Sequence, residues 1–214
     1  MVTATPPSST ESSDSDIVRL HRRSIDKVLI GMGVIATIVF AAAGGLLMWG
    51  ANFADDYVHR ELSSQNVFFP KADALTEEGR DDLVEFAGQQ VTTGAMAEAY
   101  ASYINGHLHE IADGKTYSEI DDRGAAAAVA DARAAGASAA EIAKLQATAD
   151  TLKGQRDSLF RGETLRGLLL SSYAWATIGT IAMIAAWVAF GGAALMAALV
   201  IAGIVHLRRH PTRR

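Results

Sequence analysis

The chain of 214 residues contains no cysteine, only four prolines and a low proportion of charged residues. Without cysteine it has no disulfide, no thiol nucleophile, no Cys-ligated zinc site and no iron–sulfur cluster. Charged residues make up 20% of the chain, against about 25% in soluble domains. Half of the residues are hydrophobic. This combination indicates that part of the apolar surface does not face water.

Two long segments of the chain carry no charged residue at all. The first covers residues 28–54 and the second residues 167–205. A helix of about 20 apolar residues crosses a hydrocarbon core of about 30 Å, so each segment is long enough to span a membrane. A cleaved signal peptide is the alternative for the first segment. The apolar region of a signal peptide has only about 7–15 residues and is followed by a small-residue cleavage site, whereas this segment is longer. We therefore expect residues 28–54 to be a retained membrane helix.

The second segment has 39 residues, so as one helix it would be about 58 Å long, nearly twice the hydrocarbon thickness. A hairpin near Gly191 and Gly192 would make a third span. Alternatively, a single span would keep the last part of the segment in lipid and raise its first dozen or so residues above the membrane. Basic residues that flank a span favour the cytoplasmic side of the membrane. They are present beside both segments: Arg22, Arg23, Lys27, Arg208 and Arg209. This predicts two spans in the plasma membrane, with both termini cytoplasmic and the central domain outside.

The segment between the spans, residues 55–166, is strongly acidic. Its 112 residues carry 20 Asp and Glu against 11 Lys and Arg, while residues 1–27 are neutral and residues 206–214 carry a formal charge of +4. Residues 1–27 are polar, with Ser, Thr and Pro concentrated at the start, which predicts a disordered cytoplasmic tail. Residues 206–214 are expected to form a basic cytoplasmic tail. The overall acidity argues against a nucleic-acid partner.

The acidic segment reads as helical throughout, so the expected fold is an all-α membrane protein with an extracytoplasmic helical bundle. Thr76 is expected to cap one helix, and Thr93 with Gly94 to begin the next. Gly136 interrupts an alanine-rich helix, and Ser138 has the capping-box spacing that restarts it. Apolar residues then recur at steps of three and four: Ile142, Leu145, Ala149, Leu152 and Leu159. With no proline between residues 141 and 205, we expect one long helix that continues into the second span.

Small residues recur in both spans at the spacing used for close helix packing in membranes. They are Ala41 and Gly45 in the first span and Ala182, Ala186, Ala193 and Ala197 in the second. They predict that the spans pack on each other or on the helices of a partner. Neither span contains an ionisable residue, which argues against an ion or proton pathway.

Other residues are expected at the membrane boundary. Trp49 lies at the acidic end of the first span, where an indole ring favours the lipid–water interface. Phe68 and Phe69 precede Pro70 and are expected either between helices or on the membrane surface. Arg161, Glu163 and Arg166 precede the second span, where they are expected to pair with the acidic domain or with lipid headgroups.

The sequence contains no catalytic or nucleotide-binding motif of the common kinds, such as G-x-S-x-G, a Walker loop or H-E-x-x-H. His107 and His109 point about 200° apart on a helix, so both cannot face one ion. Together with His59 they are weak metal candidates, and we interpret them as surface histidines. We therefore expect neither an enzyme nor a cofactor. The alternative is a non-haem iron oxygenase that uses these three histidines.

Five strings of the sequence are distinctive: VFFP at 67–70, AGQQVTTGAMAEAYASYI at 87–104, HL at 107–108, KTYSEI at 115–120 and LFRGETLRGLLLSSY at 159–173. Together they resemble a group of actinobacterial two-span membrane proteins of unassigned function. The alanine-rich segment 124–140 does not share the pattern. The resemblance implies an actinobacterial plasma membrane. Some relatives carry a name that suggests an aromatic ring-opening dioxygenase, but the residues here do not make up an iron site.

These observations predict a non-enzymatic membrane protein whose external helical domain binds another protein or an envelope component, as an accessory subunit of a membrane complex. The expected partners are the lipid bilayer and either another membrane protein or a second copy of the chain. The alternative is an extracytoplasmic ligand sensor. Because only about nine residues follow the second span, a sensor would need a separate cytoplasmic partner.

Overall fold

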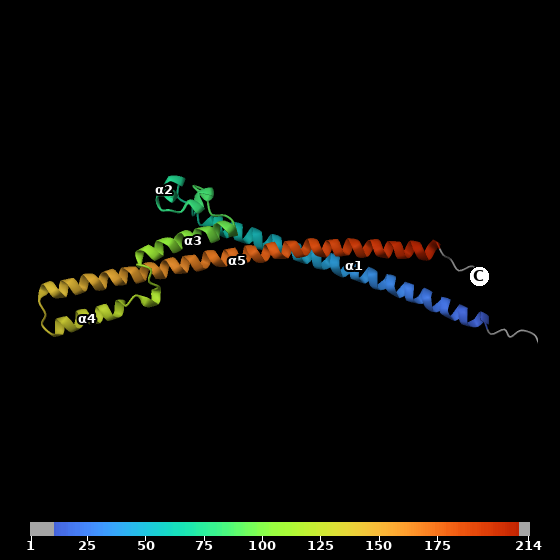
Figure 1. Ribbon diagram of the computed structural model, residues 1–214, viewed down its shortest axis with the longest axis horizontal. Helices are drawn as coiled ribbons and strands as arrows, with labels where there is room; N and C mark the ends of the chain where they lie inside the picture. Colours follow the sequence, from blue (N-terminus) through green and yellow to red (C-terminus); the bar gives the residue numbers. More distant parts are fainter. Residues whose placement is uncertain (1–10, 210–214) are drawn as a thin grey trace, which may run out of the picture. The chain divides into compact units, whose positions relative to one another are not determined.

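The computed structural model describes the backbone of residues 11–209 and the side chains of residues 24–209. Within this part of the chain the fold is all-helical, as predicted, and contains no β-strand (Figure 1). The elements are α1 (Glu11–Ser64), α2 (Ala72–Glu77), the 3-10 helix η1 (Asp81–Phe86), α3 (Gly94–Ile111), the 3-10 helix η2 (Tyr117–Glu119), α4 (Asp122–Ala134) and α5 (Ala139–Arg209).

Both long helices contain a segment long and apolar enough to cross a membrane. The expected continuous helix after Glu141 is confirmed, since α5 has no turn at Gly191 and Gly192 that would create a third span. At the other end of the chain, α1 begins at Glu11. It therefore includes residues 11–27, for which the sequence indicates disorder. Extending an established helix is far easier than nucleating a new one. The rest of that tail lies outside the described residues.

The chain divides into two compact units, and α1 and α5 contribute to both. The first unit consists of Met1–Ala51 and Ile181–Arg214, and the second of Asn52–Thr180. This division cuts the 39-residue uncharged run into residues 167–180 and residues 181–205. In the second unit Leu169 is buried in a core with Val58 and Leu62. The first part of the run therefore belongs to the second unit and contributes Leu169 to its core.

In the first unit α1 and α5 run antiparallel, and two glycines of α1 face large side chains of α5. A Cβ built at Gly44 would lie 2.9 Å from Cε1 of Phe190, and a Cβ at Gly33 would lie 2.6 Å from Cγ2 of Val200. Both distances are shorter than a carbon–carbon contact of about 3.5–4.0 Å. A side chain at either position would therefore require the facing side chain or the helix to shift.

Two glycines of α5 face large side chains of α1, at longer distances. A Cβ at Gly203 would lie 3.2 Å from Cγ1 of Ile30, and a Cβ at Gly192 would lie 3.7 Å from Cδ1 of Phe40. Large side chains thus fit over glycines in both directions across the helix pair. This mode of packing brings helix backbones close together without needing a hydrophobic effect between them.

The small residues predicted from the sequence fall partly on this contact surface. In α5, Ala186 and Ala193 are buried, and Ala182 and Ala197 are half-buried. In α1, however, Ala41 and Gly45 are exposed, and a Cβ at Gly45 would meet nothing within 4 Å. Being exposed, they remain predicted packing residues for the helices of a partner, the other alternative that their spacing indicates. Spacing alone does not show which face of α1 meets α5.

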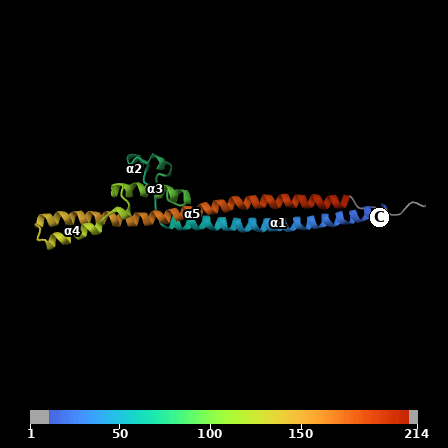
Figure 2. The same cartoon turned by 60° about the horizontal axis from the view of Figure 1, so that its bottom comes forward.

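In the second unit α3 lies along α5 in both views (Figures 1 and 2), antiparallel to it. At one end a Cβ at Gly94 would collide with the Cβ of Ala176, and at the other a Cβ at Gly162 would lie 2.8 Å from Cδ1 of Leu108. Two clusters of buried residues form the core: Val58, Leu62, Phe69, Val91, Ala97, Ala101 and Leu169 in one, and Leu108, Ala112, Ile120 and Leu159 in the other.

The ends of these helices follow the capping signals in most places. The hydroxyl of Thr93 accepts a hydrogen bond from the amide of Met96 at the start of α3. Ser138 accepts one from the amide of Glu141 near the start of α5, after Gly136 has adopted a φ of +70°. Thr76 was expected to begin a helix but lies near the end of α2. The helix starts earlier, directly after Pro70 and Lys71, so the capping prediction for Thr76 is wrong.

The seam predicted at the start of α5 is confirmed. Its members Ile142, Leu145, Ala149, Leu152 and Leu159 are all buried or half-buried. Arg156 occupies the missing position. It donates hydrogen bonds to the carbonyl of Ile120 at 3.1 Å and to Asp122 at 2.8 Å, and its guanidinium lies 4.4 Å from the ring centroid of Tyr117. Arg156, which interrupts the apolar pattern, therefore holds η2 and α4 against α5.

Candidate interaction groove

The second unit contains a groove of about 390 Å³ between α1 and α5, here called the α1/α5 groove. The α1 side is lined by Tyr57, Val58, Glu61, Leu62 and Gln65, and the α5 side by Leu165, Leu168, Leu169, Ser171, Ser172 and Trp175. Val58, Leu62 and Leu169 are buried and belong to the core beneath the groove.

The exposed part of the groove wall combines large apolar and aromatic side chains with the polar Glu61, Gln65 and Ser171. Leu168 is 64% exposed, Trp175 51%, and Tyr57 and Leu165 44% each. Leu165, Leu168 and Trp175 follow one another at steps of three and seven, which places them on one face of α5. The buried Leu169 lies on the neighbouring face that meets the core. The helix thus presents one apolar face to the domain core and leaves a second one uncovered.

Polar groups also line the groove. Ser172 donates its hydroxyl to the carbonyl of Leu168 within the same helix at 3.3 Å. Glu61 contributes one carboxylate to the lining. Exposed aromatic residues such as Trp175 and Tyr57 are of the types enriched at the centres of protein interfaces. The chemistry of the groove therefore suits apolar side chains of a partner.

The predicted boundary residues near the groove have different environments. Arg166 and Glu163 form an ion pair with each other at 2.6 Å, one turn apart on α5, and Arg161 is exposed. Their pairing with the acidic domain or with lipid headgroups stays a prediction. Phe69 is 3% exposed and packs in the core, whereas Phe68 is 53% exposed. The aromatic pair before Pro70 is thus divided between the core and the surface.

The boundary residues of the first unit are exposed where they are described. Trp49 is 68% exposed. Lys27, Arg208 and Arg209 are exposed at one end of the helix pair. The side chains of Arg22 and Arg23 lie outside the described residues.

A second cluster of polar residues surrounds a small cleft of about 30 Å³ beside α3, lined by Glu78, Arg80, Tyr103, Gly106, His107 and Glu110. His107 lies 3.7 Å from Glu78 through Nε2 and 3.8 Å from Glu110 through Nδ1. Burial, together with the carboxylate of Glu78, raises the pKa of Tyr103 to about 12. The cleft has room for about one water molecule, so it is too small for an organic substrate.

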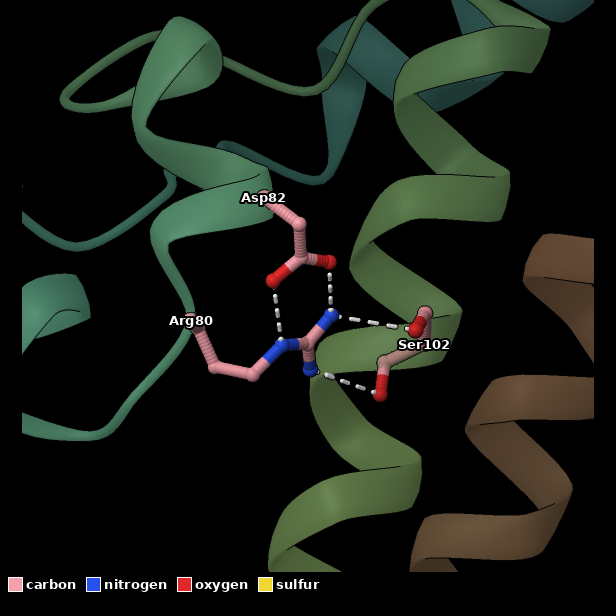
Figure 3. A network of polar contacts seen from close by, with 3 residues as sticks. All are labelled: Arg80, Asp82 and Ser102. Atoms are coloured by element: carbon pink, nitrogen blue, oxygen red, sulfur yellow. Dashed lines mark hydrogen bonds and ion pairs between the residues drawn. The ribbon is translucent and has the colours of Figure 1, made fainter.

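Arg80 joins the 3-10 helix η1 to α3 beside this cleft (Figure 3). Its Nε and Nη2 donate to the two carboxylate oxygens of Asp82 at 2.9 and 2.8 Å, and Nη1 and Nη2 donate to the carbonyl and the hydroxyl of Ser102, each at 3.1 Å. The bidentate pair lowers the pKa of Asp82 from its usual value. Arg80 could not be identified from the sequence, because a Gly-Arg-Asp-Asp turn carries no signal of a partner 22 positions away.

The structure gives each predicted metal candidate a different environment. Nδ1 of His59 lies 3.2 Å from the carbonyl of Thr92, whereas His107 faces Glu78 and Glu110. His109 lies in the last turn of α3, with its ring near Gly114. In the part of the chain that the structure describes, no group of three or more His, Asp or Glu residues could hold a metal ion.

Replacing Arg80 with glutamine is expected to lower the free energy of unfolding by about 1 kcal/mol. Buried hydrogen bonds to charged groups contribute somewhat more than this, but Asp82 is largely exposed, so its contribution is smaller. The pKa of Asp82 is depressed in the folded state, so this contribution is present above the unfolded-state pKa of about 3.9 and is lost as the pH falls through the folded-state pKa. Urea unfolding at pH 7 and pH 3 measures it. A difference between wild type and R80Q that is as large at pH 3 as at pH 7 would contradict the role of Asp82.

Comparison with known proteins adds no further constraint on the site. No family model, no curated protein and no solved structure matches the chain.

Proposed function

We propose that the chain is a two-span plasma-membrane protein whose helical domain lies outside the cell and binds another membrane protein through the α1/α5 groove. The observation that carries the membrane assignment is the exposure of the apolar helices. Only 11% of the most apolar 18-residue window of either helix is buried. A core helix of a soluble protein would be mostly buried, and large exposed apolar surfaces are rare on soluble monomers.

The dimensions of the first unit fit a bilayer. Its uncharged stretches, residues 28–51 of α1 and residues 181–205 of α5, are each about 36–38 Å long, somewhat more than the hydrocarbon core of about 30 Å. The packing of Gly33 and Gly44 against α5 also supports a retained first span, because a cleaved leader would not make these contacts. The basic residues Lys27, Arg208 and Arg209 at one end support a cytoplasmic location for both termini.

The α1/α5 groove supports a docking function. In this arrangement Leu165, Leu168 and Trp175 belong to the domain outside the lipid, so their exposed surface faces water unless a partner covers it. Covering a large apolar side chain contributes about 1.5–3 kcal/mol. A helix from a neighbouring membrane protein, or from a second copy of the chain, would supply such a cover.

Replacing Leu168 with glutamate is expected to weaken partner binding by at least about tenfold while leaving the domain folded, since Leu168 is exposed. The measurement uses a photo-crosslinking amino acid at position 57, across the groove, in native membranes. Wild type should give one discrete protein adduct, or a dimer of the chain, and L168E should lose it. Leu170, which is 38% exposed and does not line the groove, provides the matched control L170E. Adducts to lipid alone, or equal adducts in L168E and L170E, would overturn the docking function.

A further inference from the structure

The first unit contains its own groove, separate from the α1/α5 groove of the second unit. It has a volume of about 560 Å³ and is lined by Asp26, Leu29, Ile30, Gly33, Met196, Leu199, Val200, Ala202, Gly203, His206 and Leu207. The volume lies within the range of about 300–1,000 Å³ that is typical of small-molecule sites. It is lined mostly by apolar residues, with one carboxylate and one imidazole contributed by Asp26 and His206.

The groove is open because the contacts at this end of the helix pair use small side chains. Gly33 and Gly203 both line it. Val200 and Ile30 cover these glycines but do not fill the space beside them. Ala202 is exposed, and its small methyl group covers little of the solvent-facing side of the groove. The apolar part of the groove therefore offers a slot that one hydrocarbon chain could occupy.

Three exposed cations follow lining residues at the polar end of the groove in the sequence. Lys27 follows the lining residue Asp26, and Arg208 and Arg209 follow the lining residue Leu207; all three are exposed. They outnumber the one carboxylate of Asp26. The sequence places three further arginines, Arg19, Arg22 and Arg23, in the preceding part of α1. Apolar lining at one end and net positive charge at the other match the two parts of an anionic phospholipid.

We propose that this groove is a binding site for one anionic phospholipid of the cytoplasmic leaflet, with an acyl chain between α1 and α5 and its phosphate among Lys27, Arg208 and Arg209. The inference rests on the proposed membrane span. Basic pockets between membrane helices on the cytoplasmic side are suited to such headgroups, and each Lys or Arg near an anionic surface adds to the attraction. The same cations that orient the spans would thus hold a specific lipid at the helix pair.

Two variants separate the two halves of the site. R208Q/R209Q removes two charges and is expected to weaken binding of phosphatidylglycerol by about 30-fold. A202F keeps every charge but fills the slot, so it should also lose the bound lipid. The matched controls are R123Q/K144Q, which removes two exposed charges of the second unit, and A198F, which adds the same ring at an exposed alanine outside the groove lining.

The experiment is native mass spectrometry of the full chain, released from micelles that contain either phosphatidylglycerol or phosphatidylcholine. The proposal predicts one retained phosphatidylglycerol on wild type and both controls, and none on R208Q/R209Q or A202F. Equal retention of phosphatidylcholine, or loss in R208Q/R209Q but not in A202F, would overturn the site and leave the two-span function standing. Extraction of the wild-type chain from membranes by alkaline carbonate would overturn both.

Discussion

Replacing Gly44 with leucine is expected to force α1 and α5 apart in the first unit and to lower the free energy of unfolding by about 3 kcal/mol, the upper part of the usual range for overpacking. A Cβ at this position already comes within 2.9 to 3.1 Å of three ring carbons of Phe190. The remaining atoms of leucine have no space unless the ring or the helix moves. Thermal unfolding in detergent micelles would measure the loss as a lower melting temperature.

The neighbouring glycine provides the control for this experiment. A Cβ at Gly45 would meet nothing within 4 Å, so G45L changes the same residue type by the same amount on the exposed side of α1. It should unfold at the wild-type temperature or slightly above, because leucine favours helix over glycine. A second variant tests the contact itself: F190A should restore part of the stability of G44L. If G44L and G45L had the same effect, the account of the helix pair would be wrong.

Replacing Gly94 with alanine is expected to destabilise the second unit by about 1–3 kcal/mol, although alanine is otherwise the better helix former. The new Cβ would collide with the Cβ of Ala176 and would also lie 3.5 Å from the Cα of Tyr173. Neither atom lies at the end of a flexible side chain, so the start of α3 must move away from α5. Urea unfolding followed by helical circular dichroism would measure the change.

A compensating substitution makes this second prediction specific. Ala176→Gly removes the methyl group that G94A meets, at a cost of about 1 kcal/mol in helix propensity. The double variant G94A/A176G should therefore be more stable than the sum of the two single changes predicts, with a favourable coupling between the sites. The control is G154A, on α5 like Ala176. The new Cβ would have nothing within 4 Å, so this variant should be neutral or stabilising. Additive single effects would show that the two residues do not constrain each other.

The hydrophobic pattern alone predicted most of the helical architecture. The two apolar runs, the steps of three and four from Ile142 to Leu159 and the capping signals at Thr93 and Ser138 are local features, and each reports directly on backbone conformation. The continuity of α5 followed from the absence of proline. The length of the second run also indicated that its first dozen or so residues lie beyond the span. The pattern could not show that Leu169 is buried there with Val58 and Leu62, because contacts between distant residues leave no signal in an uncharged run.

The sequence was least informative where a residue acts through a distant partner. Small residues occupy several faces of α1, so only the three-dimensional pairing with Phe190 and Val200 distinguishes Gly44 and Gly33 from Gly45. Arg80 bridges to Ser102 across a turn whose geometry is set by Gly79, which has a φ of +68°. Arg156 is recognisable in the sequence, because it interrupts an otherwise regular apolar seam. A charged residue at such a position indicates a specific tertiary contact.

The central claim, that the helical domain lies outside and both termini lie inside, can be tested by labelling single introduced cysteines with a membrane-impermeant maleimide. The chain has no cysteine of its own, so each variant reports on one site. K115C, at an exposed residue of the domain, should be labelled in intact cells, whereas T212C should be labelled only after the membrane is permeabilised. Labelling of T212C in intact cells, or protection of K115C, would contradict the proposed topology.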